Sequence, residues 1–282
     1  MSPIETPKSA AVRGALCDEI AAALESLWER RRPNDASMHE VRKDLKRARA
    51  ALRLLRDAVG DAAYERENLE LRDAARPLSG VRDAAVALEV LRGLLDEEKK
   101  PARRQKLAEL RRRLLEERER ARRKLFGGPK LAAIESSLQE AGVRAEYWRY
   151  PAHDAPLRAG LERLYRKALK AARSKGSTES LHESRKQVKY LEQALAIAAN
   201  GSRRLRKLSR RARKVAERLG DDHDLAMLEA RLAALPARSK AQQKLIAGIE
   251  ARRAKLQKKA LKLARRMYRR KAAAFVDRVV AG

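Results

Sequence analysis

The chain has 282 residues and a formal net charge of +30, from 68 Lys and Arg against 38 Asp and Glu. A charge of this size predicts a polyanionic partner from the group of DNA, RNA, inorganic polyphosphate and anionic membrane surfaces. Apolar residues are 44% of the chain, which excludes a disordered basic tail because a core can form. Aromatic residues are only 4%, which argues against binding of single-stranded nucleic acid by base stacking.

The sequence contains one cysteine, Cys17. An intrachain disulfide and a cysteine-based zinc site are therefore excluded, and a reducing, cytoplasmic compartment is expected. Residues 1–14 lack the apolar segment of a signal peptide, and no apolar run reaches the roughly 18 residues that a membrane span needs. The basic segments also lack the Trp, Phe and Leu border of an interfacial helix, so no membrane partner is expected.

Turn signals divide the chain into helical segments. The first helix ends in the stretch RRRPNDAS, and the breaks of the first half lie at 30–37, 59–61, 76–80, 99–101 and 126–129. Residues 127–156 are rich in Gly and Pro and hold the aromatic cluster YWRYP, so we expect a linker packed on the body. Helices are expected to resume at about 157–174, 179–199, 202–219, 222–234 and 239–276.

The spacing of the apolar residues predicts an all-α fold. One stripe of the second helix steps by three and four residues through Val41, Leu45, Ala48, Leu52, Leu55 and Val59. Nothing alternates with a period of two over the length of a strand, and β-branched residues are few. We expect a disordered N-terminus (1–7), a first helical half (8–126), the linker (127–156) and a second helical half (157–276), together forming one domain.

Two helices resemble each other around a histidine. His39 and His182 are 143 residues apart (182 minus 39), and at this offset His, Glu, Arg, Lys, Lys, Ala and Leu recur in register. An internal duplication is the economical interpretation. Helical units this short bury their apolar faces against each other, so we expect two bundles related by a pseudo-twofold axis in one body.

Each histidine helix also carries a basic side, away from its apolar stripe. At about 100° per residue, the candidates for an anion site are His39, Arg42, Lys46, Arg49 and Arg53, and then His182, Arg185, Lys189 and, one step further round, Lys186. Most charge runs are only solvated faces, but cations at these spacings repel each other, and the repetition in both halves favours an anion site. Further basic sides are formed by Arg204, Lys207, Arg211 and Lys214, and by Lys255, Lys259, Lys262, Arg266 and Arg269.

Several roles are open to His39 and His182. Metal binding is disfavoured because cations follow each histidine at three and four residues, and no second ligand has zinc spacing. General acid catalysis is disfavoured because no phosphate-binding loop, carboxylate pair or nucleophile motif accompanies them. Two roles remain for the histidines: donating a hydrogen bond to an anion, or packing and capping at the start of the helix. We therefore expect no catalytic residue, no metal site and no cofactor.

Asp83 and Asp224 each follow a predicted helix break. A carboxylate in the first turn of a helix favours the macrodipole and can cap the helix. We therefore expect both carboxylates to be structural, with Arg82 beside Asp83 as a further candidate for the anion site.

The repeated H-x-x-R-K-x-x-K helix, followed in each half by a break and an Asp, resembles the CHAD (conserved histidine α-helical domain) family over about residues 8–276. The resemblance implies two pseudo-twofold bundles with a basic central channel that binds inorganic polyphosphate, and localisation to polyphosphate granules. It implies a channel lined by His39, Arg42, Lys43, Lys46, His182, Arg185, Lys186 and Lys189. Tyr190 and Glu192 stand where further basic residues are common, which predicts a less basic second half of the channel.

No E-x-E-x-K pattern of an appended triphosphatase is present, so the resemblance implies a stand-alone, non-catalytic binding module. A polyphosphate chain has about one charge per phosphate and no bases, so a site for it needs many Lys and Arg and no aromatic platforms. Two alternatives stay open. The charge alone also supports binding of nucleic acid, at least weakly, and a phosphohydrolase acting on polyphosphate is the third hypothesis.

Overall fold

The computed structural model describes residues 6–28, 35–148, 150–173, 177–199, 202–236 and 239–280. All regular secondary structure in these ranges is helical, which confirms the all-α class. The first helices are α1 (Pro7–Trp28), α2 (Asp35–Val59), α3 (Asp61–Ala75), α4 (Ser79–Glu97) and α5 (Pro101–Phe126). The chain continues through α6 (Lys130–Glu146), α7 (Ala155–Arg173), α8 (Thr178–Ile197), α9 (Arg203–Ala233), α10 (Lys240–Met267) and α11 (Ala272–Val280).

The breaks expected at 59–61, 76–80, 99–101 and 126–129 are confirmed, whereas residues 30–34 of the break expected at 30–37 lie outside the described residues. The expectation that 127–156 is a linker, with helices resuming only at 157, is wrong. This segment contains α6, whose buried residues Ile134, Leu138, Ala141 and Ala145 recur at helical spacing. The helix packs on α1 and α3, so this segment does lie against the body. Of the expected disordered N-terminus, residues 1–5 lie outside the described residues, and α1 already begins at Pro7.

Two boundaries of the second half are also wrong. The break expected near residue 220 does not occur, and α9 continues through Gly220 because buried Leu219, Asp222 and Leu225 extend one stripe across it. The helix expected at 239–276 ends instead at Met267, where Tyr268 leaves helical geometry, and α11 follows as a separate element.

The apolar stripe of α2 holds the centre of the fold. Val41, Leu45, Ala48, Leu52 and Leu55 are all 0% exposed, and α1, α3, α7 and α8 pack around this helix. Each fully buried Leu or Val stabilises the fold by roughly 2 kcal/mol. Like-charge repulsion along a helix costs only a few tenths of a kcal/mol per pair. The core therefore outweighs the repulsion on the basic side of α2.

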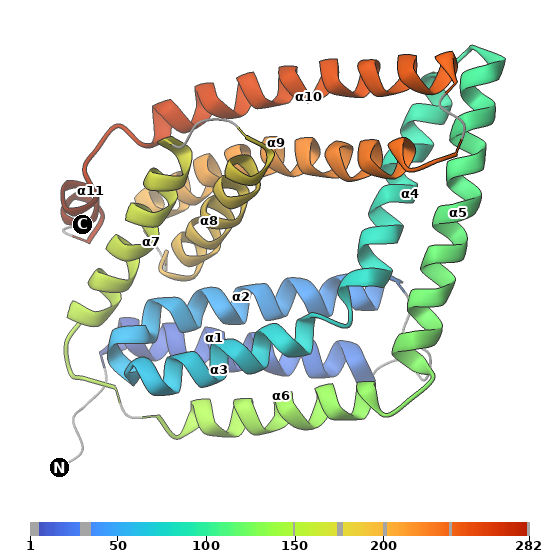
Figure 1. Ribbon diagram of the computed structural model, residues 1–282. Helices are drawn as coiled ribbons and strands as arrows, with labels where there is room; N and C mark the ends of the chain where they lie inside the picture. The colour runs from blue at the N-terminus through green and yellow to red at the C-terminus, as the bar shows by residue number, and fades with distance from the viewer. Residues whose placement is uncertain are drawn as a thin grey trace.

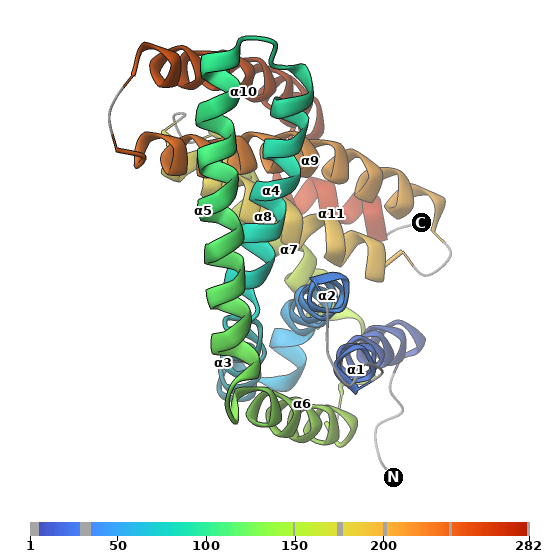
Figure 2. The same ribbon diagram turned by 90° about the vertical axis from the view of Figure 1, so that its right-hand side faces the viewer.

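The two halves of the sequence share their hydrophobic cores. The main core contains residues of α1, α2, α3 and α6 from the first part of the chain. In the same core lie residues of α7 and α8 and of the adjoining parts of α9, α10 and α11. A second core joins Leu91 and Leu110 of the α4–α5 hairpin to Leu228 of α9 and Ile249 of α10. Figures 1 and 2 show this hairpin standing away from the α1–α2–α3–α6 layer and reaching α9 and α10. Each half is therefore incomplete without the other.

A close approach of α7 to α2 depends on Gly160. A Cβ atom at this position would lie 2.6 Å from the carbonyl oxygen of Leu54, inside contact distance. Glycine therefore allows the two backbones to touch. Arg163 and Lys167 follow one and two turns later on α7, and this contact sets their height above the basic side of α2.

Candidate anion-binding site

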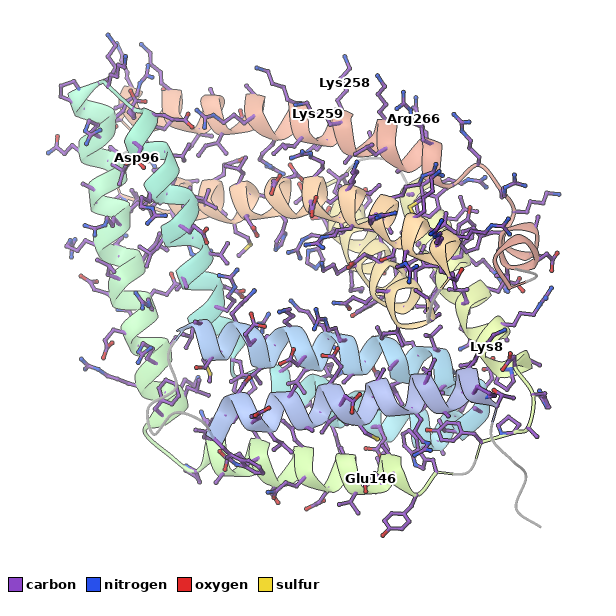
Figure 3. All side chains as sticks on the ribbon, turned by 180° about the vertical axis from the view of Figure 1, so that it is seen from behind. Lys8, Asp96, Glu146, Lys258, Lys259 and Arg266 are labelled. Carbon is purple, nitrogen blue, oxygen red and sulfur yellow. The ribbon has the colours of Figure 1, made fainter. Side chains whose placement is uncertain are left out.

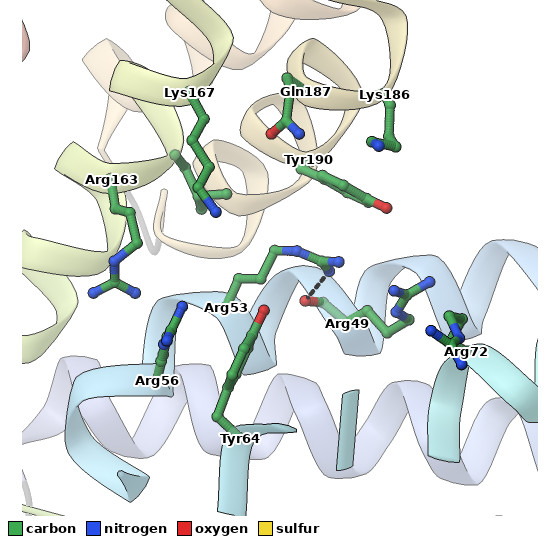
Figure 4. Close-up of a pocket in the computed structure, with 11 residues that line it drawn as sticks. Arg49, Arg53, Arg56, Tyr64, Arg72, Arg163, Lys167, Lys186, Gln187 and Tyr190 are labelled. Atoms are coloured by element: carbon green, nitrogen blue, oxygen red, sulfur yellow. Dashed lines mark hydrogen bonds between the residues drawn. The ribbon is translucent and has the colours of Figure 1, made fainter. Parts of the chain in front are cut away.

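A cavity of about 390 Å³ lies where α2, α3, α7 and α8 meet (Figure 4), and we call it the inner recess. It is lined by Arg49, Arg53, Arg56, Tyr64, Arg72, Arg163, Leu164, Lys167, Lys186, Gln187 and Tyr190. Seven of these side chains are cationic and none is a carboxylate. Arg49, Arg53 and Lys186 come from the predicted set, so the structure brings the basic sides of both histidine helices to one cavity.

Arg49 and Arg53 are held by neutral partners. Arg49 Nε and Arg53 Nη2 both donate to Oδ1 of Asn68, at 3.1 and 3.3 Å, and Arg53 Nη1 donates to the Arg49 carbonyl oxygen at 2.6 Å. The Arg53 guanidinium also lies 3.8 Å from the ring centroid of Tyr190. These contacts fix the direction of the guanidinium groups without neutralising them. Burial and the charge of Arg53 lower the pKa of Arg49.

Other cations of the inner recess are held from its edge. Arg56 lies 4.8 Å from the Tyr64 ring centroid and donates through Nε to Asp61 at 2.7 Å. Arg163 pairs with Asp57. None of these carboxylates lines the recess itself. They orient the cations while leaving the cavity strongly positive, which makes it a candidate site for an anion.

Next to the inner recess, motif residues of α2 and α8 face each other, and we call this set the motif cluster: Arg42, Lys46, Arg185 and Lys189. Lys46 is exposed to solvent, yet surrounding protein and the charges of Arg42, Arg185 and Lys189 lower its pKa to about 8. Arg42 corresponds to Arg185 at the 143-residue offset, and Lys46 corresponds to Lys189. Equivalent positions of the two helices therefore lie within electrostatic reach of each other.

Arg42 has a structural role that the sequence did not show. Its Nη1 donates to the carbonyl oxygen of Ala75 at 3.1 Å and to Oγ of Ser79. It thereby joins the last residue of α3 to the first residue of α4. Its Nε is buried without a hydrogen-bond partner in the described part of the chain. Burial lowers the pKa of Arg42 despite the opposing charge of Asp83.

The histidines lie at the edge of the motif cluster. His182 Nδ1 and His223 Nδ1 are 3.4 Å apart, which permits one hydrogen bond in a suitable tautomer. Burial lowers the pKa of His223 to about 4, with the charges of Arg185 and His182 adding to the effect. Burial and Arg82 lower the pKa of His39. His223 stands within α9, beside the motif cluster.

The expected capping roles of Asp83 and Asp224 are wrong. Neither α4 nor α9 has an acidic residue in its first turn, since Asp83 is the fifth residue of α4 and Asp224 lies in the interior of α9. Both carboxylates face the cations instead. Burial raises the pKa of Asp224, while Arg185 and Arg82 oppose this shift. They supply partial counter-charge to the motif cluster.

Other predicted site residues lie elsewhere. Lys43 pairs with Glu40 and does not line the inner recess, although its counterpart Lys186 does. Arg204, Lys207 and Arg211 line a second cavity, of about 730 Å³, which we call the outer recess. Its full lining is Arg203, Arg204, Lys207, Leu208, Arg211, Arg266, Met267, Arg269, Arg270 and Phe275. Lys214 lines neither cavity and is exposed.

Sequence reasoning missed much of the inner recess. Arg56 could have been found, because it extends the side that carries Arg49 and Arg53 by one further turn. Arg163 and Lys167 are spaced by four residues on α7, but nothing in the sequence brings α7 over α2, because that placement depends on the close contact at Gly160. Tyr190, expected to weaken the site, aligns Arg53 in it.

The inner recess and motif cluster supply many donors and few acceptors. Such a set binds phosphate or carboxylate oxygens through charge-assisted hydrogen bonds. Within the described ranges, no three His, Cys, Asp or Glu side chains gather closely enough to hold a metal ion. A membrane-crossing helix, long and apolar enough, is also not found in the part of the chain that the structure describes.

Comparison with known proteins identifies relatives by sequence and by fold. The family model of the CHAD domain matches residues 14–233. PptA from Streptomyces chartreusis has a similar structure, with a TM-score of 0.69, 16% identity, and coverage of 94% of this chain and 100% of that chain. The CHAD domain from the plant Ricinus communis gives a TM-score of 0.60, 18% identity, and coverage of 100% and 94%. Comparison with curated protein sequences gives no match.

Proposed function

The chain belongs to the CHAD domain family, and from this premise we propose that it binds inorganic polyphosphate through the inner recess and the motif cluster. One observation carries the proposal. Four helices place seven cations and no carboxylate around one cavity, with the guanidinium groups already held in position for a ligand. Such preorganisation lowers the entropy cost of binding.

The chemistry of this lining favours a phosphate chain over nucleic acid. The aromatic rings at the inner recess are already occupied: Tyr190 stacks on Arg53 and Tyr64 on Arg56. They therefore leave less aromatic surface on which bases could stack. A cavity of about 390 Å³ also suits a thin chain better than a duplex, whose grooves are read by an inserted element. Nucleic-acid binding through the net charge of +30 is the competing function.

The proposed role is binding without turnover. The described side chains that line the inner recess donate hydrogen bonds and supply neither a carboxylate base nor a set of oxygen ligands for Mg²⁺. A phosphohydrolase would instead release phosphate from polyphosphate in a manner that depends on His39 or His182. We further propose a cytoplasmic location on polyphosphate granules.

We also propose that α2 and α8 descend from one duplicated unit that frames a basic channel. The facing pairs support this proposal, because Arg42 meets Arg185 and Lys46 meets Lys189 at equivalent positions. A pseudo-twofold axis between the helices brings like residues together in this way. It doubles the positive charge at the axis and makes an anion there more favourable.

The test uses exposed cations, because reversal of half-buried Arg42 would also break the α3–α4 junction. The double variant Lys46→Glu and Lys186→Glu is expected to weaken binding of long-chain polyphosphate about 100-fold, or about 2.7 kcal/mol. The matched control reverses Lys99 and Lys258, which are exposed and line neither cavity. Equal affinity of the two double variants would refute the site.

A further inference from the structure

The outer recess lies apart from the proposed site and shares no lining residue with it. The beginning of α9, the end of α10 and the chain up to α11 form its walls. Figure 3 shows basic side chains gathering around Arg266 on this side of the molecule. The cavity of about 730 Å³ is the larger of the two.

Seven cations line the outer recess and no carboxylate does. Four of them, Arg203, Arg204, Lys207 and Arg211, stand on α9, and Arg266, Arg269 and Arg270 stand opposite. All seven side chains are exposed. Among the described residues, six of them (Arg203, Lys207, Arg211, Arg266, Arg269 and Arg270) make no side-chain ion pair. This differs from the inner recess, where neighbouring carboxylates hold several of the cations.

The helix that forms one wall makes this arrangement costly without a ligand. The first turn of α9 contains no acidic residue and begins with Arg203 and Arg204. Cations at a helix N-terminus oppose the positive end of the macrodipole, whereas an anion there is stabilised. Ser202 caps this turn by accepting a hydrogen bond from the Leu205 N–H, and the positive end of the helix and the basic side chains favour the same kind of ligand.

The floor of the outer recess narrows the choice of ligand. Met267 and Phe275 are 8% and 4% exposed, and the Phe275 ring stacks on Tyr165 with centroids 3.9 Å apart. No aromatic face is thus open for a base. From Arg204 to Arg211 the α9 wall extends for about 10 Å at 1.5 Å per residue. A trough with cations on both walls over this length suits a linear chain of several phosphates.

We propose that the outer recess is a second, independent binding site for a stretch of linear phosphate chain. The proposal deepens the proposed function and rests on it for the identity of the ligand. The binding energy at the outer recess comes from residues that the inner recess does not use. Here Lys207 and Arg211 of α9 and Arg269 beyond α10 contact the phosphate chain. Each protein molecule then binds two short chains, one in each recess.

The experiment is calorimetric titration with tripolyphosphate, a probe with three phosphates, at low and at near-physiological salt. Four proteins are compared: wild type, the inner variant Lys46→Glu/Lys186→Glu, an outer variant Lys207→Glu/Arg269→Glu, and the combination of both. Two binding events are expected for wild type, one for each double variant and none for the combination. Circular dichroism and the midpoint of thermal unfolding establish that all four proteins are folded.

The outcomes separate the two proposals. An outer variant that keeps two binding events would overturn the second site and leave the inner one intact. An inner variant that keeps both events would instead refute the proposed function. A parallel titration with a short DNA duplex tests whether the outer recess binds nucleic acid instead of a phosphate chain. If the outer variant loses duplex binding about tenfold while its tripolyphosphate binding is unchanged, the outer recess is a nucleic-acid surface and the proposal fails.

Discussion

The inner and outer recesses have the same number of cationic side chains but differ in how those side chains are held. In the inner recess, Arg53 stacks on Tyr190 and bonds to Asn68, and Arg163 pairs with Asp57. In the outer recess the cations are exposed, and within the described residues most of them have no charged partner. The two cavities therefore carry the same number of cations but hold them with different rigidity. Guanidinium groups held in a fixed direction predict that the inner recess is selective for its anion. Exposed cations without fixed direction predict that the outer recess attracts anions mainly by charge, which salt screens.

The largest expected effect comes from charge reversal in long-chain polyphosphate binding. The inner variant Lys46→Glu/Lys186→Glu is expected to lose about 100-fold in affinity and the outer variant Lys207→Glu/Arg269→Glu about tenfold. Fluorescence anisotropy with labelled polyphosphate at near-physiological salt measures both. Larger loss in the outer variant would reverse the ranking of the two sites.

Arg53→Lys sharpens the comparison without changing the charge. Lysine has no planar group to stack on Tyr190 and cannot hold the Asn68 side chain and the Arg49 carbonyl oxygen with a rigid fork, so affinity for polyphosphate is expected to fall about tenfold. The matched change Arg269→Lys in the outer recess removes no recorded stacking partner and is expected to change affinity less than about twofold. Equal effects would mean that orientation of the inner guanidinium groups does not matter.

The pH dependence of binding tests the histidines. The pKa of His223 is about 4 in the free protein, and a bound anion would raise it by stabilising the protonated ring. Affinity should therefore increase as pH falls below the pKa of the complex and level off near pH 4. Between pH 7.5 and 5.5 we expect a gain of about fivefold. His223→Gln is expected to remove it, and titration of the ligand cancels in the comparison with wild type. If wild type and His223→Gln gain the same affinity between pH 7.5 and 5.5, His223 is not the group that causes the pH dependence.

The smallest effect concerns stability without ligand. Lys46 has a pKa of about 8 against an ordinary 10.5, so its protonated form destabilises the fold. The cost exists at neutral pH, declines between pH 8 and 10.5, and is absent above that range. Because Lys46 is exposed, Lys46→Met is expected to raise the free energy of unfolding by only about 1 kcal/mol at pH 7. Urea denaturation at pH 7 and 10.5 measures this.

Lys207→Met in the outer recess serves as the comparison for this stability change. Its side chain is exposed, so the free energy of unfolding is expected to change by less than about 0.5 kcal/mol. A gain for Lys46→Met that persists at pH 10.5 would point to apolar packing rather than to relief of charge.

Much of the fold could be predicted because local periodicity is strong. The stripe from Val41 to Leu55 identifies α2 and its buried side from residue spacing alone. Gly220 led to the wrong prediction of a helix break. The apolar stripe does not stop at this glycine but continues to Leu225, so the helix continues as well. The segment with α6 misled for the opposite reason, since Gly and Pro at its ends hid a short regular stripe from Ile134 to Ala145.

The candidate site was predictable only in part, because it depends on helices meeting from distant parts of the chain. The basic sides of α2 and α8 were visible as a repeat, and the structure brings Arg49, Arg53 and Lys186 together. The position of α7 above them depends on a backbone contact at Gly160, which no periodicity reveals. The separation of Lys207 into its own recess likewise follows from how α9 packs, not from its sequence.

The most direct test of polyphosphate binding is a competition titration at near-physiological salt. Labelled long-chain polyphosphate bound to the wild-type protein is displaced by unlabelled polyphosphate or by duplex DNA, matched in phosphate concentration. A site shaped for a thin phosphate chain predicts that polyphosphate competes at least 100-fold better, or about 2.7 kcal/mol. Equal competition by duplex DNA would contradict this account and identify the charge as a general nucleic-acid-binding surface.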